Sequence, residues 1–318
     1  MNLDSEDEGE LFIGCAGGKD TAITLNYSKV PVNYDCVALV IKVIGLSGGH
    51  SGDDINKGLG NANKILNRLL WNASNHFEIR ISSFEGGNLR NAIPREAFAT
   101  ISVPKRFKDE FIQYVKDFNA IVKTEYRTTE PGLLVSCQTT EMPASVMDLS
   151  SQERLLNALY ACPHGVIAMS ADVPNFVETS TNLASVKFND KQIIIGTSQR
   201  SSSESGKEDV VSMVASVFKL AGGKIVHSDG YPGWTPNPNS IILDITRNAY
   251  ERLFSNKPKV LAIHAGLECG LIGEQYPEMD MISYGPTIKG AHSPDERLLI
   301  STVGKFWDLT LEVLRNIP

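Results

Sequence analysis

The order of apolar patterns between residues 36 and 137 constrains the fold of this chain more than any other feature. Two segments, Ile55 to Leu69 and Phe107 to Val122, repeat apolar residues every three or four positions, as one face of an α-helix does. Four shorter segments are continuously apolar or alternate as strands do, at residues 36–44, 77–83, 97–103 and 133–137. This β-α-β-β-α-β order predicts a ferredoxin-like unit, with two helices on one face of an antiparallel sheet.

A looser version of the same order follows along the chain. We expect helices near 152–160 and 210–221, with strands at 166–169, 183–188, 192–197 and 224–226. Before the first unit, a strand at Leu11–Cys15 is followed by Gly17-Gly18, which we interpret as a turn. Residues 18–230 are therefore predicted to form one extended or doubled α+β unit.

The character of the sequence changes at the Pro/Gly-rich stretch Tyr231–Pro238, which predicts a domain junction. Beyond it we expect a helix, a strand, a glycine-rich turn and a second strand, at residues 240–254, 260–263, 266–273 and 281–284. A capping box formed by Ser293 and Glu296, with Pro294 between them, predicts a final helix that runs to about Asn316. This alternating order indicates an α/β fold.

The length and charge of the chain limit its class. It has 318 residues, 30 Lys and Arg against 37 Asp and Glu, and a formal charge of −7, so we expect about two domains. The acidic balance argues against a nucleic-acid or anionic-membrane binder, and no apolar run approaches the ~20 residues of a membrane span. The five scattered cysteines and the acidic N-terminus indicate reduced thiols in a cytoplasmic protein without a signal peptide.

Three residues in or beside loops stand out as candidate functional groups. His50 lies in Gly48-Gly49-His50-Ser51-Gly52, which could bring backbone close to a ligand or could equally be a tight turn with Ser51 as a helix cap. Arg200 ends a predicted strand, where its guanidinium could bind a carboxylate or could simply be solvated. His292 precedes the last predicted helix, as a metal ligand or a surface residue.

Two further segments have the composition of metal or nucleophile sites. Asp4 belongs to an acidic cluster that could bind a cation or form a solvated turn. The stretch His264-Ala265-Gly266-Leu267-Glu268-Cys269-Gly270 contains a carboxylate, a histidine and a thiol. A nucleophilic pair of Cys269 and His264 is one hypothesis for this stretch.

Taken together and in this order, the motifs resemble those of one family, the aminoacyl-histidine dipeptidases, which are zinc-dependent peptidases with two co-catalytic metals. The resemblance covers essentially the whole chain. Its most specific parts are Asn2–Glu6, Gly14–Gly18, Gly48–Gly52, Gly58–Asn63, Asn88–Pro94, Arg200–Ser202, Tyr231–Trp234, His264–Gly270 and Gly290–Pro294.

The resemblance implies an α/β catalytic domain that binds zinc and an inserted ferredoxin-like lid. Residues 1–17 and 231–318 would be parts of the catalytic domain, and 18–230 would be the lid. The implied roles are zinc ligation for Asp4 and His292, each on a different ion, oxyanion stabilisation for His50 and Asn91, grip on the substrate carboxylate for Arg200, and further substrate contacts for His264 and Glu268.

The sequence departs from the family in one respect. Members begin with a segment that carries a His-x-Asp motif, a bridging aspartate and a Glu-Glu pair. This sequence has no Glu-Glu pair, and its only His-x-Asp is His227-Ser228-Asp229, outside that context. We therefore expect the polypeptide alone to bind zinc weakly, to be inactive, and to need a missing N-terminal segment as a partner.

Three functional hypotheses follow. The leading one is the lid and C-terminal portion of a two-zinc peptidase that hydrolyses Xaa-His and related dipeptides. The second is a non-catalytic module that binds peptides or another protein, and the third is a cysteine hydrolase that uses Cys269 and His264. The expected partner is a small peptide, with neither nucleic acid nor membrane, and a homo-oligomer is compatible with the sequence.

Overall fold

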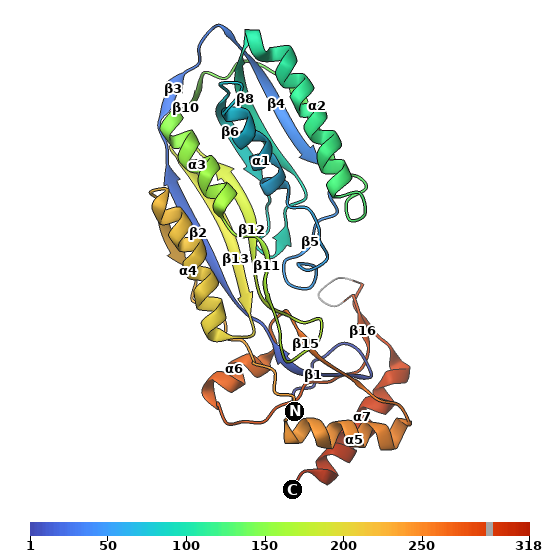
Figure 1. Cartoon of the computed structure of the whole chain (residues 1–318). Helices are drawn as coiled ribbons and strands as arrows, with labels where there is room; N and C mark the ends of the chain where they lie inside the picture. The colour runs from blue at the N-terminus through green and yellow to red at the C-terminus, as the bar shows by residue number, and fades with distance from the viewer. Residues whose placement is uncertain (291–294) are drawn as a thin grey trace.

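The computed structural model describes residues 1–290 and 295–318, and its largest element is a nine-stranded sheet (Figure 1). The strand order is β14-β2-β13-β12-β6-β8-β4-β9, with β11 paired to β12. The bounds of these strands are β2 Gly17–Asn26, β4 Cys36–Ile44, β6 Arg80–Gly86, β8 Ala97–Pro104, β9 Leu134–Thr139, β11 Gly165–Met169, β12 Val177–Phe188, β13 Gln192–Ser201 and β14 Lys224–His227.

Half of this sheet is the predicted ferredoxin-like unit. It contains β4, α1 (Ala62–Ser74), β6, β8, α2 (Lys108–Glu125) and β9, and its strands lie in the order β6-β8-β4-β9 with antiparallel neighbours. In chain order this is 2-3-1-4, the arrangement of a ferredoxin-like sheet. The predicted β-α-β-β-α-β fold class is confirmed.

The other half repeats the arrangement with a different connection. Its strands lie in the order β14-β2-β13-β12, which is 4-1-3-2 when β2 is counted first, and its helices are α3 (Leu149–Ala161) and α4 (Glu204–Leu220). The first unit is therefore inserted between β2 and α3 of the second. The two units join at the edges of β6 and β12, where Gly86 pairs with Val186.

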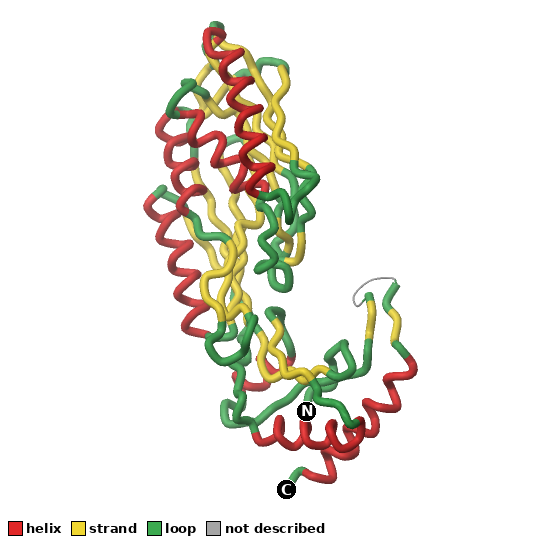
Figure 2. Tube along the Cα trace, turned by 45° about the vertical axis from the view of Figure 1, so that its right-hand side comes forward, coloured by secondary structure: helices red, strands yellow, loops and turns green. Residues whose placement is uncertain are grey.

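Helices α1 to α4 cover one face of the sheet and bury its main core (Figures 1 and 2). Helix α1 packs on the sheet through its apolar face, on which Leu66, Leu69 and Leu70 are fully buried. The helix begins at Ala62 rather than near Ile55, as the spacing of apolar residues had suggested, because Asn61 caps it by accepting hydrogen bonds from the second and third helical N–H groups. Ile55 is still buried, but in a turn of the preceding loop.

The predicted turn at Gly17-Gly18 is wrong, because these residues open strand β2 and pair with Ser201 and Arg200. They are packed too closely to carry side chains. A Cβ atom on Gly17 would lie 2.4 Å from the backbone nitrogen of Gly233, and one on Gly18 would lie 2.6 Å from the ring of Tyr231. The two glycines therefore allow a close backbone approach rather than a reversal of the chain.

The remaining elements form a smaller part around a second core (lower part of Figure 1). Strands β1 and β15 pair in parallel, and three helices surround them; the bounds are β1 Glu10–Cys15, β15 Lys259–Ile263, α5 Ile241–Phe254, α6 Glu268–Gln275 and α7 Ile300–Asn316. The second core contains Leu11, Leu243 and Leu309, one from each of three distant segments. Both cores fit the predicted mixed α/β class, whereas the domain limits at residues 17 and 230 stay a prediction.

Three predicted features of this smaller part are wrong. Residues 266–273 are largely helix α6 rather than a turn, and 281–284 form only isolated bridges through Ser283 rather than a strand. Helix α7 begins after Leu299 instead of at the capping box, because Arg297–Leu298 (β17) pairs with Ile288–Lys289 (β16). Ser293 and Pro294 lie outside the described residues.

Four short strands complete the structure. Strand β3 (Lys29–Pro31) pairs with β10 (Ser145–Met147), and β5 (Gly49–His50) pairs with β7 (Ala92–Ile93). A 3-10 turn, Lys105–Phe107, leads into α2. Within the described ranges, no helix is both long and apolar enough to cross a membrane.

Candidate functional site

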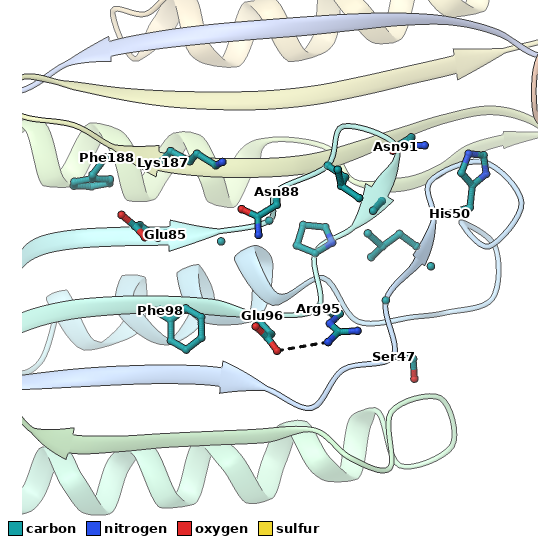
Figure 3. Close-up of a pocket in the computed structure, with 18 residues that line it drawn as sticks. Ser47, His50, Glu85, Asn88, Asn91, Arg95, Glu96, Phe98, Lys187 and Phe188 are labelled. Carbon is teal, nitrogen blue, oxygen red and sulfur yellow. Dashed lines mark ion pairs between the residues drawn. The ribbon is translucent and has the colours of Figure 1, made fainter. Parts of the chain in front are cut away.

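His50 and Asn91 lie on two paired loops at the lower end of the first unit. Strand β5 brings His50 opposite Ala92, and the Ser51 N–H donates a 2.8 Å hydrogen bond to the Asn91 carbonyl oxygen. Figure 3 shows the two side chains at the same end of a cavity of about 990 Å³ that also extends along the sheet to Phe98. The structure therefore brings these two predicted residues together.

The imidazole of His50 is oriented by Asp53. The His50 Nδ1 atom lies 3.1 Å from the Asp53 carboxylate and 3.2 Å from the Asp53 backbone nitrogen, so the tautomer decides which contact is the hydrogen bond. The hydrogen bond to His50 lowers the pKa of the Asp53 carboxyl. An ionised carboxylate at this distance fixes the ring and leaves Nε2 for other partners.

Arg200 is the most deeply buried arginine of the site, with 8% of its surface exposed. Its Nη1 donates to the hydroxyl of Tyr231 at 3.1 Å and to the carbonyl oxygen of His264 at 3.5 Å, while Nε has no hydrogen-bond partner. No ion pair is formed by Arg200 within the part of the chain that the structure describes. A buried guanidinium held only by neutral oxygens is suited to an anionic ligand.

His264 lies beside Arg200 and is neutral at physiological pH. Burial, with a further contribution from the positive charge of Arg200, lowers the pKa of His264 to about 4. Its Nε2 is 2.7 Å from the hydroxyl of Ser180, and its Nδ1 has no hydrogen-bond partner. The side chain is therefore buried beside Arg200 without carrying a charge.

At Gly52 the His50 loop meets the carbonyl oxygen of His264, the same oxygen that accepts from Arg200. A Cβ atom on Gly52 would lie 2.3 Å from the His264 carbonyl oxygen and 3.1 Å from Cε1 of His50. The positive charge of Arg200 also helps to lower the pKa of Asp53. One side chain of the first unit (His50), one of the second (Arg200) and one of the smaller part (His264) thus converge on one site.

Asp4 and Glu268 lie in a separate group of polar residues. Asn2 links them, since its amide nitrogen donates to the Glu268 carboxylate at 2.9 Å and its amide oxygen accepts from the Asp4 N–H at 3.1 Å. Both carboxylates are exposed. His292, the other predicted metal ligand, lies outside the described residues.

Cys269 and His264 do not form a nucleophilic pair. Cys269 is 1% exposed, and burial raises its pKa to about 11, so the thiol stays protonated near neutral pH. The ring of His264 is hydrogen-bonded to Ser180 instead. The structure therefore argues against the cysteine-hydrolase hypothesis.

Sequence reasoning missed three residues that hold the predicted ones in place: Tyr231, Asp53 and Ser180. Tyr231 belonged to a recognised motif but had no assigned role, and Asp53 follows the glycine-rich loop directly. Ser180 lies within strand β12, and no local pattern distinguishes it from other polar residues of a sheet.

Comparison with known proteins gives consistent matches. A family model described as a peptidase dimerisation domain matches residues 41–130. The cytosol non-specific dipeptidase of Escherichia coli (strain K12) is 44% identical over 320 residues, which cover 100% of this chain and 66% of that protein. A crystal structure of aminoacylhistidine dipeptidase from Vibrio alginolyticus is 42% identical with a TM-score of 0.96, covering 100% of this chain and 65% of that one. This chain thus spans a little under two thirds of the length of both relatives.

Proposed function

This chain is homologous along its whole length to aminoacylhistidine dipeptidase and to cytosol non-specific dipeptidase, and on that premise we propose that it supplies the substrate-holding part of a metal-dependent dipeptidase. The observation that carries the proposal is Arg200, a buried guanidinium with two neutral partners and a free Nε, placed between His264 and the His50 loop.

Arg200 would bind the C-terminal carboxylate of the peptide. A carboxylate would neutralise the charge of the guanidinium and accept the hydrogen bonds that it does not yet donate. The hydroxyl of Tyr231 already holds Nη1 of the guanidinium in place. Because this contact fixes the end of the peptide, it sets the distance to the bond that is cleaved. Short peptides with a free carboxylate are therefore the proposed substrate class, Xaa-His dipeptides among them.

His50 and Asn91 would act on the carbonyl group of the bond that is cleaved. Each side chain can donate a hydrogen bond to an oxygen on which negative charge develops, and the pairing of their loops fixes their separation. His264 would contact the substrate as a neutral group, consistent with its pKa of about 4. Glu268 is proposed to contact the substrate from the first turn of α6.

We also propose that the complete enzyme uses two zinc ions, with Asp4 and His292 each on a different ion. The described residues do not by themselves fit such a site. No group of three His, Cys, Asp or Glu side chains that could hold a metal occurs among them, and Asp4 is a single exposed carboxylate. A zinc ion held by so few ligands would bind weakly, so this polypeptide alone is proposed to be inactive.

The remaining ligands are proposed to lie in the third of the relatives that this chain does not match. Two surfaces support this. Helix α7 exposes Ile300 (83%), Trp307 (59%) and Leu314 (53%), and β1 and β15 form a parallel pair with no third strand in the described part. Parallel strands normally belong to larger, covered sheets, and exposed apolar patches normally mark an interface.

A second candidate is a peptide-binding module without hydrolysis. It is favoured by the same buried arginine, taken together with the incomplete metal site among the described residues. It predicts the same grip on a carboxylate and differs only in the absence of turnover.

One experiment separates the two. The unmatched segment of the aminoacylhistidine dipeptidase is fused to this chain, and zinc content and hydrolysis of an Xaa-His dipeptide are measured for the fused protein and for the chain alone. The proposal expects zinc-dependent turnover only in the fused protein. A folded, zinc-loaded fused protein that binds the dipeptide without cleaving it would support the binding module instead.

We also propose an oligomeric state and a cellular location. A homo-oligomer is supported by the match of residues 41–130 to a dimerisation domain. A cytoplasmic location is supported by the five free cysteines and by the name of the cytosolic relative.

A further inference from the structure

The loop that carries His50 is closed at its base by one buried carboxylate, that of Glu130. The two oxygens of this carboxylate accept hydrogen bonds from the backbone N–H of Ser47, before His50, at 2.7 Å and from the backbone N–H of Gly60, after it, at 2.8 Å. Glu130 is 1% exposed. A single side chain therefore ties together both ends of the loop.

The setting of Glu130 makes these two bonds important. A buried carboxylate is costly unless it is paired, and none of the ion pairs in the described part of the chain includes Glu130. The two N–H groups are thus its main stabilising partners, and hydrogen bonds to an ionised acceptor are stronger than neutral ones. The carboxylate therefore holds the two ends of the loop together, and the two N–H groups of the loop in turn stabilise the buried carboxylate.

Glu130 is itself held by the end of helix α2. Its backbone N–H donates to the Tyr126 carbonyl oxygen at 2.8 Å, and its own carbonyl oxygen accepts from Leu133 at 3.1 Å, just before strand β9. Both neighbouring elements belong to the main core, through Val122 and Val135 among others. The carboxylate therefore has a fixed position relative to the sheet.

Inside the loop, further hydrogen bonds fix the backbone of His50. The Asp54 carboxylate accepts from the His50 N–H at 2.7 Å, and the Asp54 N–H donates to the His50 carbonyl oxygen at 3.1 Å. The Ser51 N–H holds the Asn91 loop at 2.8 Å. The base of the loop, the backbone of His50 and the Asn91 loop thus form one hydrogen-bonded unit.

We propose that Glu130 is a positioning residue, whose carboxylate clamps Ser47 to Gly60 and so sets where His50 and Asn91 stand relative to Arg200. This role rests on the proposed function, because it concerns the geometry with which His50 meets the substrate. A purely structural Glu130 would stabilise the fold without any particular effect on this loop.

The chain offers a matched control in Asp148. Its carboxylate also bridges two backbone N–H groups, those of Ser28 at 3.2 Å and Ser151 at 3.0 Å, but at the start of α3, away from the His50 loop. Glu130→Gln and Asp148→Asn each replace one acceptor oxygen with an amide that cannot accept. Comparing them separates a loop-specific effect from a general loss of stability.

The first test is amide hydrogen exchange on the 318-residue chain. Glu130→Gln should raise exchange across residues 47–60 by about tenfold or more, as expected when the negative charge is removed and one of the two hydrogen bonds that close the loop is lost, and Asp148→Asn should leave it unchanged. Exchange within twofold of the unmodified chain in Glu130→Gln would overturn the proposal. If that variant does not fold, Glu130→Asp, which keeps the charge but shortens the reach, should show a smaller rise in the same segment.

The second test uses the fused protein. Glu130→Gln should lower kcat for the dipeptide by about tenfold while KM changes by less than about threefold, because Arg200 still holds the carboxylate while His50 is misplaced at the reacting carbonyl. Equal kcat losses in Glu130→Gln and Asp148→Asn would contradict the positioning role. If the fused protein has no activity at all, the proposed function fails, and the exchange experiment still decides the role of Glu130.

Discussion

His264, the buried one of the two histidines of the site, links the chemistry of a single residue to the stability of the fold. Burial holds the pKa of His264 at about 4 in the folded chain, below its usual value of 6.5. The unfolded chain therefore takes up a proton as the pH falls through 6.5, whereas the folded chain does not until about pH 4. The contribution of His264 to the free energy of unfolding should therefore be fully present above pH 6.5 and should decline as the pH falls from 6.5 to about 4.

We predict that His264 makes the unfolding free energy about 2 kcal/mol smaller at pH 5 than at pH 7. His264→Gln should reduce that pH dependence by the same amount in chemical denaturation. His164, whose pKa burial also lowers to about 4, is unaffected by this change and contributes its own share in both proteins. An identical pH dependence with and without His264 would contradict the assignment.

Tyr231 provides a second test at the residue scale. Its hydroxyl accepts a hydrogen bond from Arg200, so Tyr231→Phe leaves one guanidinium N–H without a partner. In the fused protein we expect KM for the dipeptide to rise about fivefold, in line with about 1 kcal/mol for one hydrogen bond, with little change in kcat. Tyr114→Phe, which removes a hydroxyl bonded to the Leu69 carbonyl oxygen in the core, should leave KM unchanged.

At the scale of elements, Asn61 sets the start of helix α1 just beyond the His50 loop. Its side-chain oxygen accepts from the N–H groups of Asn63 and Lys64, and its amide donates to Leu183 in strand β12. Asn61→Ala should lower the unfolding free energy by about 2 kcal/mol, because a cap and a buried hydrogen bond are both lost. Asn75→Ala, at the exposed other end of the helix, should cost no more than about 0.5 kcal/mol in the same denaturation experiment.

Elements with a long apolar face could be predicted from the sequence, and those set by distant contacts could not. The faces of α1 and α2 and the apolar run of β4 define the ferredoxin-like unit without any tertiary information. Gly17-Gly18 has the local pattern of a turn, but distant packing against Tyr231 and Gly233 makes it part of a strand. Residues 297–298 likewise pair with β16 before α7 can begin.

The same distinction applies to the site. His50, Asn91 and Arg200 lie in recognisable motifs, so the sequence could point to them. Ser180, which holds His264, and Glu130, which holds the His50 loop, are far from these partners along the chain and follow no local period. Their roles depend on hydrogen bonds that only the folded chain brings together.

At the scale of the whole molecule, the two sheet units must stay joined for His50 and Arg200 to face one site. Gly87 lies at the junction with φ of +73°, and a Cβ atom there would lie 1.9 Å from the carbonyl oxygen of Ala184 in β12. Gly87→Ala should therefore destabilise the chain by about 3 kcal/mol or more, through both strain and overlap.

Gly58 is the matched control for this prediction. Its φ is nearly the same, +70°, but an added Cβ atom would meet only a methyl group of Thr129, at 3.6 Å. Gly58→Ala should cost about 1 kcal/mol, the conformational penalty alone. Equal losses for the two variants in chemical denaturation would show that the junction is not tightly packed at Gly87.

The central claim, that Arg200 holds the carboxylate of a peptide substrate, is tested most directly by comparing an Xaa-His dipeptide with its C-terminal amide. We predict that kcat/KM of the fused protein is about a hundredfold higher for the free acid, the effect of losing charge-assisted hydrogen bonds in a buried site. Arg200→Ala should abolish that preference. Arg80→Ala should retain it, because Arg80 lies elsewhere, on strand β6 of the same sheet, although its Nε also has no hydrogen-bond partner. A hundredfold preference that survives in Arg200→Ala would contradict the account.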